Sequence, residues 1–247
     1  MEVSIFDLDK TLTKNSTSFT VARKLLFKNQ LPSKSLLKYL KNYLVSFIAN
    51  KEMKENDLQN FINDSLLSLK NYSQIEMQNK IDKILTPILH KLIYKKAFLT
   101  LREEIKEGRI LILATAAPKE IADIFAKHLG FHHVVSTNLE VKENQYTGLL
   151  DSPFCHGEEK TKRVISLLKE LKVGNTSVKA FSDSYNDLSL LTLSSNPTAV
   201  NPDSSLRRHS KSNNWEIIDY KNFRLARKIF YSSLSATFLY FTVIFAF

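Results

Sequence analysis

Residues 3–13, VSIFDLDKTLT, decide the fold class of this 247-residue chain. Residues 3–8 form an apolar run rich in β-forming residues, which predicts a buried parallel strand. The run ends in an acidic pair, Asp7 and Asp9. Because residues two apart on a strand face the same way, we expect both carboxylates on one side of the strand end.

Three further runs repeat this pattern of a short apolar strand. They are residues 109–114 (RILILA) before Thr115, residues 133–137 (HVVST), and residues 177–182 (SVKAFS) before Asp183 and Asp187. A helical stretch over residues 119–129, capped by Gly130, separates the first two. Strands that alternate with helices predict an α/β fold with a Rossmann-like parallel sheet. In such sheets ligands bind beyond the carboxyl ends of the strands, where these polar residues lie.

The sequence changes character between the first strand and the rest of the sheet. Residues 36–48 place apolar side chains on one face of a helix at steps of three and four. We therefore predict an α/β core formed by residues 1–13 and 98–222, with a helical cap inserted at residues 14–97 that can cover the site. Residues 138–151 predict a β-hairpin, although its turn at Glu143 and Asn144 has no glycine.

The last segment, residues 223–247, is apolar. Residues 229–247 are 19 consecutive residues without a charge, and Arg224, Arg227 and Lys228 precede them. That length is about the minimum for crossing a bilayer, and the basic residues would lie on the cytoplasmic side. We predict an apolar C-terminal helix that anchors the protein to the cytoplasmic side of a membrane. The alternative is a helix packed on the core of a cytoplasmic protein.

Composition narrows the classes of partner. The 35 Lys and Arg against 25 Asp and Glu leave a formal charge of +10, which favours phosphate-bearing partners. The sequence has no zinc-finger spacing, no aromatic run typical of RNA-binding domains and no recognisable DNA-reading helix, so we expect no nucleic-acid partner. The single cysteine, Cys155, excludes an internal disulfide and a zinc site with several cysteines.

The acidic residues favour phosphoryl transfer. Of two carboxylates such as Asp7 and Asp9, one can attack phosphorus and form an acyl phosphate, while the other protonates the leaving oxygen and later activates water. A phosphate dianion repels carboxylates, so such a site also needs a divalent cation and positive or N–H donors. Asp183 and Asp187 offer the hard oxygen ligands that suit Mg²⁺, and Lys160 would add a positive charge early in a helix.

The motifs occur in the order DxDxT, a Thr at a strand end, a Lys at a helix start, and DxxxD. Over residues 3 to about 220, this order resembles that of the haloacid dehalogenase superfamily of phosphohydrolases. The segments FDLDKTLT, ILATAAP, CHGEEKTKRV, FSDSYNDLSLL and AVNPDSSLRR look like the subfamily that contains the phosphoserine phosphatases. The resemblance implies that Asp7 is the phosphorylated nucleophile and Asp9 the general acid and base. The further roles that it implies are phosphate binding by Thr11, Thr115 and Lys160, and Mg²⁺ binding by Asp7, the backbone carbonyl of Asp9 and Asp183, supported by Asn186 and Asp187.

The resemblance has one departure that bears on the substrate. In phosphoserine phosphatases, an acidic residue seven positions after the second motif aspartate helps to recognise the substrate amino group, and here Ser16 stands there. An ammonium group would lose its counter-charge, which argues against phosphoserine. Our hypothesis is Mg²⁺-dependent hydrolysis of a phosphate monoester at the membrane, such as a lipid phosphate. The alternatives are a phosphatase of a small soluble metabolite, transfer of phosphate to an acceptor other than water, and a membrane-attached interaction module with little turnover.

Overall fold

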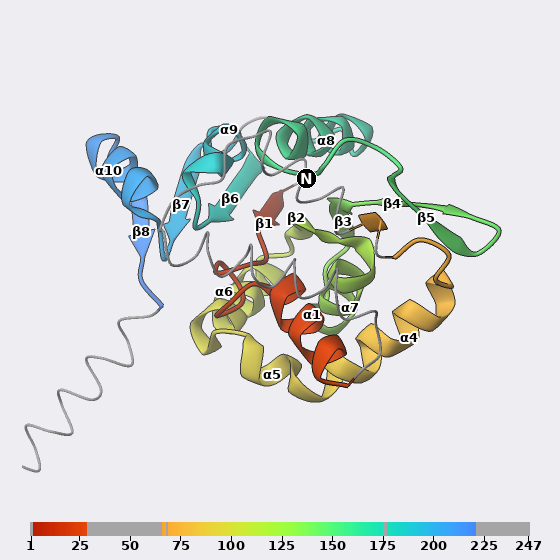
Figure 1. Ribbon diagram of the computed structural model, residues 1–247. Coiled ribbons are helices and arrows are strands. Elements are labelled where there is room, and N and C mark those ends of the chain that lie inside the picture. The colour runs from red at the N-terminus through yellow and green to blue at the C-terminus, as the bar shows by residue number, and fades with distance from the viewer. Residues whose placement is uncertain (1, 29–65, 68, 175–176, 221–247) are drawn as a thin grey trace, which may run out of the picture.

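A computed structural model of the protein describes residues 2–28, 66–67, 69–174 and 177–220 (Figure 1). At its centre is a six-stranded sheet in the order β3-β2-β1-β6-β7-β8, and every neighbouring pair is parallel. The strands are β1 (Val3–Phe6), β2 (Ile110–Pro118), β3 (His133–Thr137), β6 (Val178–Ser182), β7 (Asn196–Val200) and β8 (Glu216–Ile218). The predicted parallel α/β sheet is therefore confirmed, and the first strand of the sequence lies at its middle.

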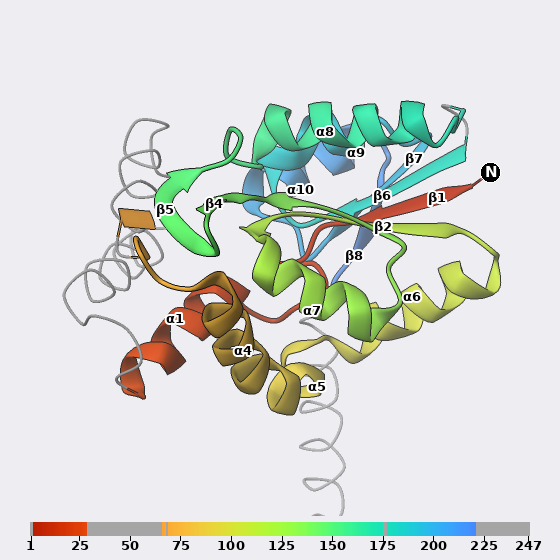
Figure 2. The same ribbon diagram turned by 90° about the vertical axis from the view of Figure 1, so that its right-hand side faces the viewer.

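Helices cover both faces of this sheet (Figure 2). One face carries α1 (Thr17–Phe27), α4 (Gln74–Leu85), the short turn η1 (Thr86–Ile88), α5 (Leu89–Leu92), α6 (Lys95–Lys106) and α7 (Lys119–Leu129). The other face carries α8 (Gly157–Glu170) and α9 (Leu188–Leu191), which follows the turn η3 (Tyr185–Asp187), and α10 (Ser204–Ser212) packs beside β7 and β8. Gly130 ends α7 with φ 80°, as predicted for a glycine cap.

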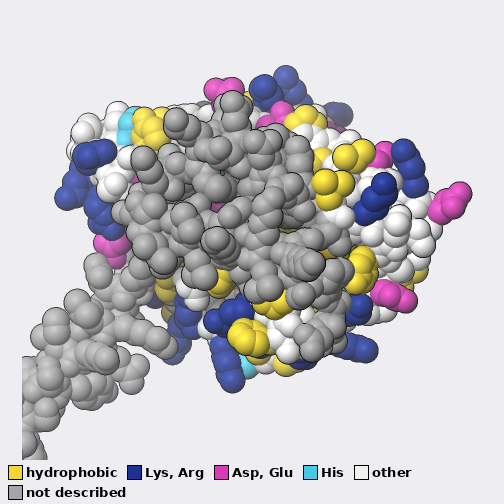
Figure 3. All heavy atoms as spheres, viewed as in Figure 1, with side chains coloured by type: hydrophobic (Ala, Val, Ile, Leu, Met, Phe, Trp, Pro, Cys, Tyr) yellow, Lys and Arg dark blue, Asp and Glu magenta, His cyan; other side chains and the backbone are white. Residues whose placement is uncertain are grey.

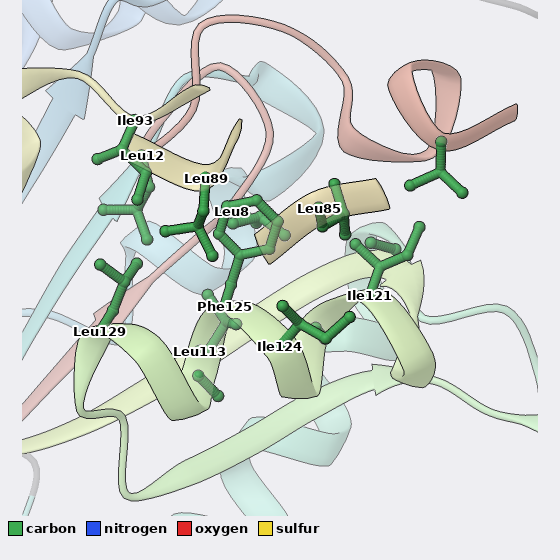
Figure 4. Packing of buried hydrophobic residues seen from close by; sticks show 14 of the residues in the cluster. Leu8, Leu12, Leu85, Leu89, Ile93, Leu113, Ile121, Ile124, Phe125 and Leu129 are labelled. Carbon is green, nitrogen blue, oxygen red and sulfur yellow. The ribbon is translucent and has the colours of Figure 1, made fainter. Parts of the chain in front are cut away.

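Each face has its own hydrophobic cluster. On the α7 face, Leu113 of β2 and Leu8, which follows β1, pack with Leu85 from α4 and Phe125 from α7 (Figure 4). On the opposite face, Val164 of α8 belongs to a cluster with strand residues of β1 and β2. The burial of apolar area on both sides is the main force that holds the sheet between the helices.

The predicted helical cap is described only in part. Its described helices α1, α4 and α5 contribute to the same hydrophobic cluster as α6 and α7. Residues 29–65 lie outside the described part of the chain, and with them the apolar stripe at residues 36–48. The division into a core and a cap at residues 14–97 therefore stays a prediction.

The predicted hairpin is confirmed as the antiparallel pair β4 (Leu139–Lys142) and β5 (Gln145–Leu150). Its turn residues Glu143 and Asn144 have φ of 48° and 61°. A two-residue hairpin turn of type I′ needs positive φ at both positions, and here two residues other than glycine adopt it. The hairpin also joins the inserted segment, because Tyr146 exchanges backbone hydrogen bonds with Asn71 and Tyr72 at 2.9 and 3.0 Å.

The membrane prediction rests on the basic net charge and on the apolar C-terminal segment. On the face seen in Figure 3, Lys and Arg side chains lie in several places around the described surface. Within the described ranges, no helix is both long enough and apolar enough to cross a membrane. The predicted anchor, residues 223–247, lies outside those ranges.

Candidate active site

The acidic residues follow the carboxyl ends of neighbouring strands. Pairing aligns Phe6 of β1 with Leu113 of β2 and with Phe181 of β6. Asp7 therefore begins level with the end of β6, and its N–H donates to the carbonyl oxygen of Phe181 at 3.0 Å. The same register brings Asp183, two residues beyond Phe181, to this edge of the sheet.

Lys160 connects two of the carboxylates. It lies in the first turn of α8, early in the helix as expected from the sequence. Its ammonium nitrogen donates to Oδ1 of Asp7 at 3.0 Å and to the carboxylate of Asp187 at 2.9 Å. The three residues are 2%, 6% and 3% exposed in the order Lys160, Asp7 and Asp187, so this is a buried triad of one cation and two anions.

Burial controls the protonation of this triad. It raises the pKa of Asp7 to about 6, and the neighbouring Lys160 ammonium counteracts that rise. Burial alone would lower the pKa of Lys160, but the charges of Asp187 and Asp7 outweigh it and raise that pKa. The lysine therefore stays a cation, and its charge favours the ionised, nucleophilic form of Asp7.

A second set of contacts lies around Asp183. The hydroxyl of Thr11 donates to Oδ1 of Asp183 at 3.4 Å, which joins the first motif to the last. Ser182 donates to Asp187 at 2.7 Å. Burial, followed by the charge of Asp7, raises the pKa of Asp183 well above its usual value. Asp7 and Asp183 are thus two buried carboxylates that repel each other.

This donor set fits a divalent cation. Asp7 and Asp183 are hard oxygen ligands, and a cation between them would remove their repulsion. Within residues 2–28, 66–67, 69–174 and 177–220, no cluster of three or more His, Cys, Asp or Glu side chains could hold a metal ion. The expected set, however, has two carboxylates and a backbone carbonyl, and Mg²⁺ keeps several waters as further ligands.

Asp9 makes its hydrogen bond to the start of α1 and not to the buried triad. Its Oδ1 accepts a hydrogen bond from the backbone N–H of Thr17 at 2.8 Å, at the N-terminus of α1. Burial raises the pKa of Asp9, and this N–H counteracts the rise. Ser16 caps the same helix, and its hydroxyl accepts from the N–H of Phe19 at 3.3 Å. The residue that stands where an acid was expected is therefore engaged in capping α1.

Thr115 and Asn186 have weaker links to the centre. Thr115 is buried within β2, which continues to Pro118, so the prediction that the strand ends before Thr115 is wrong; its hydroxyl accepts from the N–H of Ala117 at 3.1 Å. Among the hydrogen bonds of the described residues, none joins Thr115 to Asp7. Asn186 is half-buried in η3, directly before Asp187, and its backbone N–H donates to the hydroxyl of Ser184 at 3.2 Å. The structure thus joins Asp7 and Asp187 through Lys160, and Thr11 to Asp183. Thr115 lies within β2 and Asn186 within η3.

Three polar residues at this edge were missed from the sequence: Ser182, Asn201 and Asp203. Ser182 is the last residue of β6, and its place in an apolar run predicts only a strand residue. Asp203 caps α10 by accepting from the N–H groups of Ser205 and Leu206 at 2.9 and 2.8 Å. An Asp ahead of a helical run is a recognisable N-cap signal. The contact of its own N–H with the carbonyl of Asp183, at 2.8 Å, could not be read from sequence.

The sequence and the fold are similar to those of known proteins. The sequence model described as haloacid dehalogenase-like hydrolase matches residues 5–192. The chain is 29% identical over 225 residues to phosphoserine phosphatase SerB1 of Mycobacterium tuberculosis (strain ATCC 25618 / H37Rv), covering 91% of this chain and 72% of that protein. It is 24% identical over 229 residues to a histidinol-phosphatase of Neisseria meningitidis serogroup C (strain 8013), covering 89% and 99% of the two. A solved structure of a protein with unknown function from Bordetella pertussis Tohama I has the same fold, with a TM-score of 0.77, 22% identity, and coverage of 88% of this chain and 98% of that one.

Proposed function

The chain belongs to the haloacid dehalogenase-like hydrolase family and is a phosphoric monoester hydrolase, and we propose that it hydrolyses a small soluble phosphate monoester through a phosphorylated Asp7. The observation that carries this proposal is the buried triad of Lys160 with Asp7 and Asp187. A buried lysine that neutralises one of two carboxylates leaves Asp7 ionised and able to approach a phosphate dianion.

The proposed reaction has two steps. A carboxylate oxygen of Asp7 attacks phosphorus, the bond between phosphorus and the ester oxygen breaks, and Asp9 gives its proton to the leaving oxygen. Asp9 then takes a proton from water, the water oxygen attacks phosphorus, and inorganic phosphate leaves with Asp7 restored. Burial raises the pKa of Asp9, which favours the protonated form that the first step needs.

The phosphate needs donors as well as a nucleophile. Lys160 supplies a buried positive charge, and the hydroxyls of Thr11 and Thr115 can turn from their present partners toward phosphate oxygens. Asp7, the backbone carbonyl of Asp9 and Asp183 would hold Mg²⁺, with Asn186 and Asp187 beside them. When bound, that cation would neutralise charge on the phosphate and on the carboxylates.

The comparisons favour a soluble substrate over a lipid phosphate. The names of the two curated relatives, phosphoserine phosphatase and histidinol-phosphatase, describe enzymes that act on small esters, and each match covers about nine-tenths of this chain. Ser16, however, offers no charge to an ammonium group and already caps α1. We therefore propose a small soluble phosphate monoester without naming phosphoserine itself.

A panel of esters tests this proposal. Turnover would be measured in the presence of MgCl₂ on phosphoserine, histidinol phosphate, uncharged alcohol phosphates and phosphatidic acid in vesicles. The proteins would be the parent chain, Asp7→Asn and, as a control at an exposed aspartate, Asp151→Asn. We expect turnover of a soluble ester, a loss of at least about a thousandfold in Asp7→Asn and no change in the control. A phosphatidic acid preference would contradict the soluble class, and an active Asp7→Asn would contradict the nucleophile.

Two further parts of the hypothesis stay predictions. Membrane attachment through residues 229–247 would be tested by vesicle sedimentation of the full chain beside a chain that ends at residue 222. Phosphate transfer would be tested by adding alcohols and measuring how the phosphorylated intermediate partitions between alcohol and water. Equal sedimentation of both chains would contradict the anchor.

A further inference from the structure

The loop of residues 201–203, between β7 and α10, contacts both loops that carry the acidic residues. The side-chain amide of buried Asn201 donates to the carbonyl oxygen of Lys10 at 3.0 Å. Lys10 follows Asp9 and has φ 62°, in the left-handed region that disfavours residues other than glycine and asparagine. The contact therefore holds an unfavourable turn directly after the proposed general acid.

Asp203 makes the corresponding contacts to the other acidic loop. Its N–H donates to the carbonyl oxygen of Asp183 at 2.8 Å, and its Oδ2 accepts from the N–H of Tyr185 at 2.7 Å. These two bonds hold the backbone at both ends of residues 183–185. The bond to the Asp203 carboxylate is charge-assisted, and such bonds are about twice as strong as neutral ones.

The loop itself is well anchored. Oδ1 of Asp203 accepts from the N–H groups of Ser205 and Leu206, at the start of α10. Oδ1 of Asn201 accepts from the N–H of Tyr220 at 2.7 Å, and the N–H of Asn201 donates to Ile218 of β8 at 2.8 Å. Residues 201–203 are thus fixed to the sheet and to a helix, and can resist movement of either acidic loop.

We propose that Asn201 and Asp203 are positioning residues, which hold the turn at Lys10 and the turn at residues 183–185 at the spacing that Mg²⁺ binding requires. The inference rests on the proposed function, because it takes Asp7, the carbonyl of Asp9 and Asp183 as the metal ligands. The side chains of Asn201 and Asp203 bond to backbone groups, and neither residue belongs to the proposed ligand set. Each acts by fixing backbone groups next to a ligand, and removal of such supporting contacts weakens metal affinity by about 10 to 100-fold.

Two substitutions separate this role from general stability. Asn201→Gly deletes both side-chain bonds but keeps the backbone, because glycine adopts the φ of 45° at that position without strain. Its control is Asn214→Gly, at an exposed asparagine with φ 53°. Asp203→Ser keeps a good N-cap for α10 but loses the bond to the N–H of Tyr185. Its control is Ser73→Ala, which removes the cap of α4.

The first measurement is the midpoint of Mg²⁺ binding without substrate, obtained by fitting the rise of the melting temperature over a series of MgCl₂ concentrations. The second is the midpoint of the MgCl₂ dependence of ester turnover. We expect both midpoints to rise about tenfold in Asn201→Gly and in Asp203→Ser, and to stay within twofold of the parent in both controls. If Asn201→Gly does not fold, Asp203→Ser decides. If the variants melt at a lower temperature than the parent but keep its midpoints, the inference is overturned and the proposed function stays intact. A parent chain that shows neither a thermal shift nor activation with MgCl₂ would overturn the metal site and this inference together.

Discussion

The ammonium nitrogen of Lys160 lies 3.0 Å from Oδ1 of Asp7, although 153 positions separate the two residues in the chain. The contact exists because β1 lies at the middle of the sheet and the first turn of α8 lies over the end of that strand. Two buried carboxylates share this one cation, so its removal changes both stability and chemistry.

Lys160→Met tests the shared cation. The substitution leaves Asp7 and Asp187 buried without a counter-charge, so we expect the free energy of unfolding to fall by about 3 kcal/mol. Loss of a charged donor to the phosphate should lower kcat/KM by about 100-fold or more. Denaturant unfolding and ester turnover measure the two effects. Lys162→Met, at the exposed lysine two positions on, is the matched control and should change neither.

Removal of the divalent cation should have a pH-dependent effect on stability. The pKa of Asp7 is about 6 in the folded metal-free protein against 3.8 for the ordinary side chain, so folding favours its protonated form. That contribution is fully present below about pH 4 and is lost as the pH rises through 6, which costs the metal-free protein at most about 3 kcal/mol. Mg²⁺ binds the ionised form, and its stabilising effect should therefore grow over the same interval.

Melting temperatures in EDTA and in MgCl₂, compared at pH 5, 6 and 7, measure this difference. We expect a small rise with MgCl₂ at pH 5 and a larger one at pH 7. The dependence should weaken in Asp7→Asn, which cannot titrate at that position. An equal rise at pH 5 and pH 7 would count against competition between protons and the cation at Asp7.

Tyr146→Phe tests the contact between the hairpin and α7. The Tyr146 hydroxyl donates to Oε1 of buried Glu120 at 2.7 Å, while Oε2 of Glu120 has no hydrogen-bond partner among the described residues. Removing the hydroxyl leaves the whole buried carboxylate unpaired, so we expect a loss of about 1–3 kcal/mol in the free energy of unfolding. Tyr220→Phe is a matched control, because its hydroxyl bonds to half-buried Thr100 and leaves no buried charge alone. A loss no larger than in the control would contradict this account.

Glu104→Ala should lower stability without changing substrate affinity. Glu104 is buried on α6, accepts from Ser4 of β1 at 2.5 Å and from Lys179 of β6 at 3.0 Å, and pairs with Arg109 at 3.3 Å. Ser4 and Lys179 lie near the starts of β1 and β6, and Asp7 and Asp183 follow the opposite ends of these two strands. We expect the free energy of unfolding to fall by about 2 kcal/mol, less than for a fully buried pair, because Lys179 keeps some access to solvent. KM should not change. Glu103→Ala, at the exposed neighbour, should leave both quantities unchanged.

The sequence alone determined the local elements of this protein. Residues 3–8 predicted a buried strand, and β1 lies there, although it ends at Phe6 before the acidic pair. The glycine cap of α7 and the hairpin turn at Glu143 and Asn144 were readable as well, because strand burial, helix caps and tight turns depend on residues close together in the chain. The family was also readable, since its motifs have a fixed order.

Only the tertiary structure decided which polar groups meet. The bond from Thr11 to Asp183 and the contacts of Asn201 and Asp203 with the acidic loops join residues that are distant in sequence and carry no local pattern. Their partners are mostly backbone groups, which every residue possesses, so residue type does not reveal them. Strand order and register set these contacts, because the parallel sheet brings the ends of β1, β6 and β7 to a single edge.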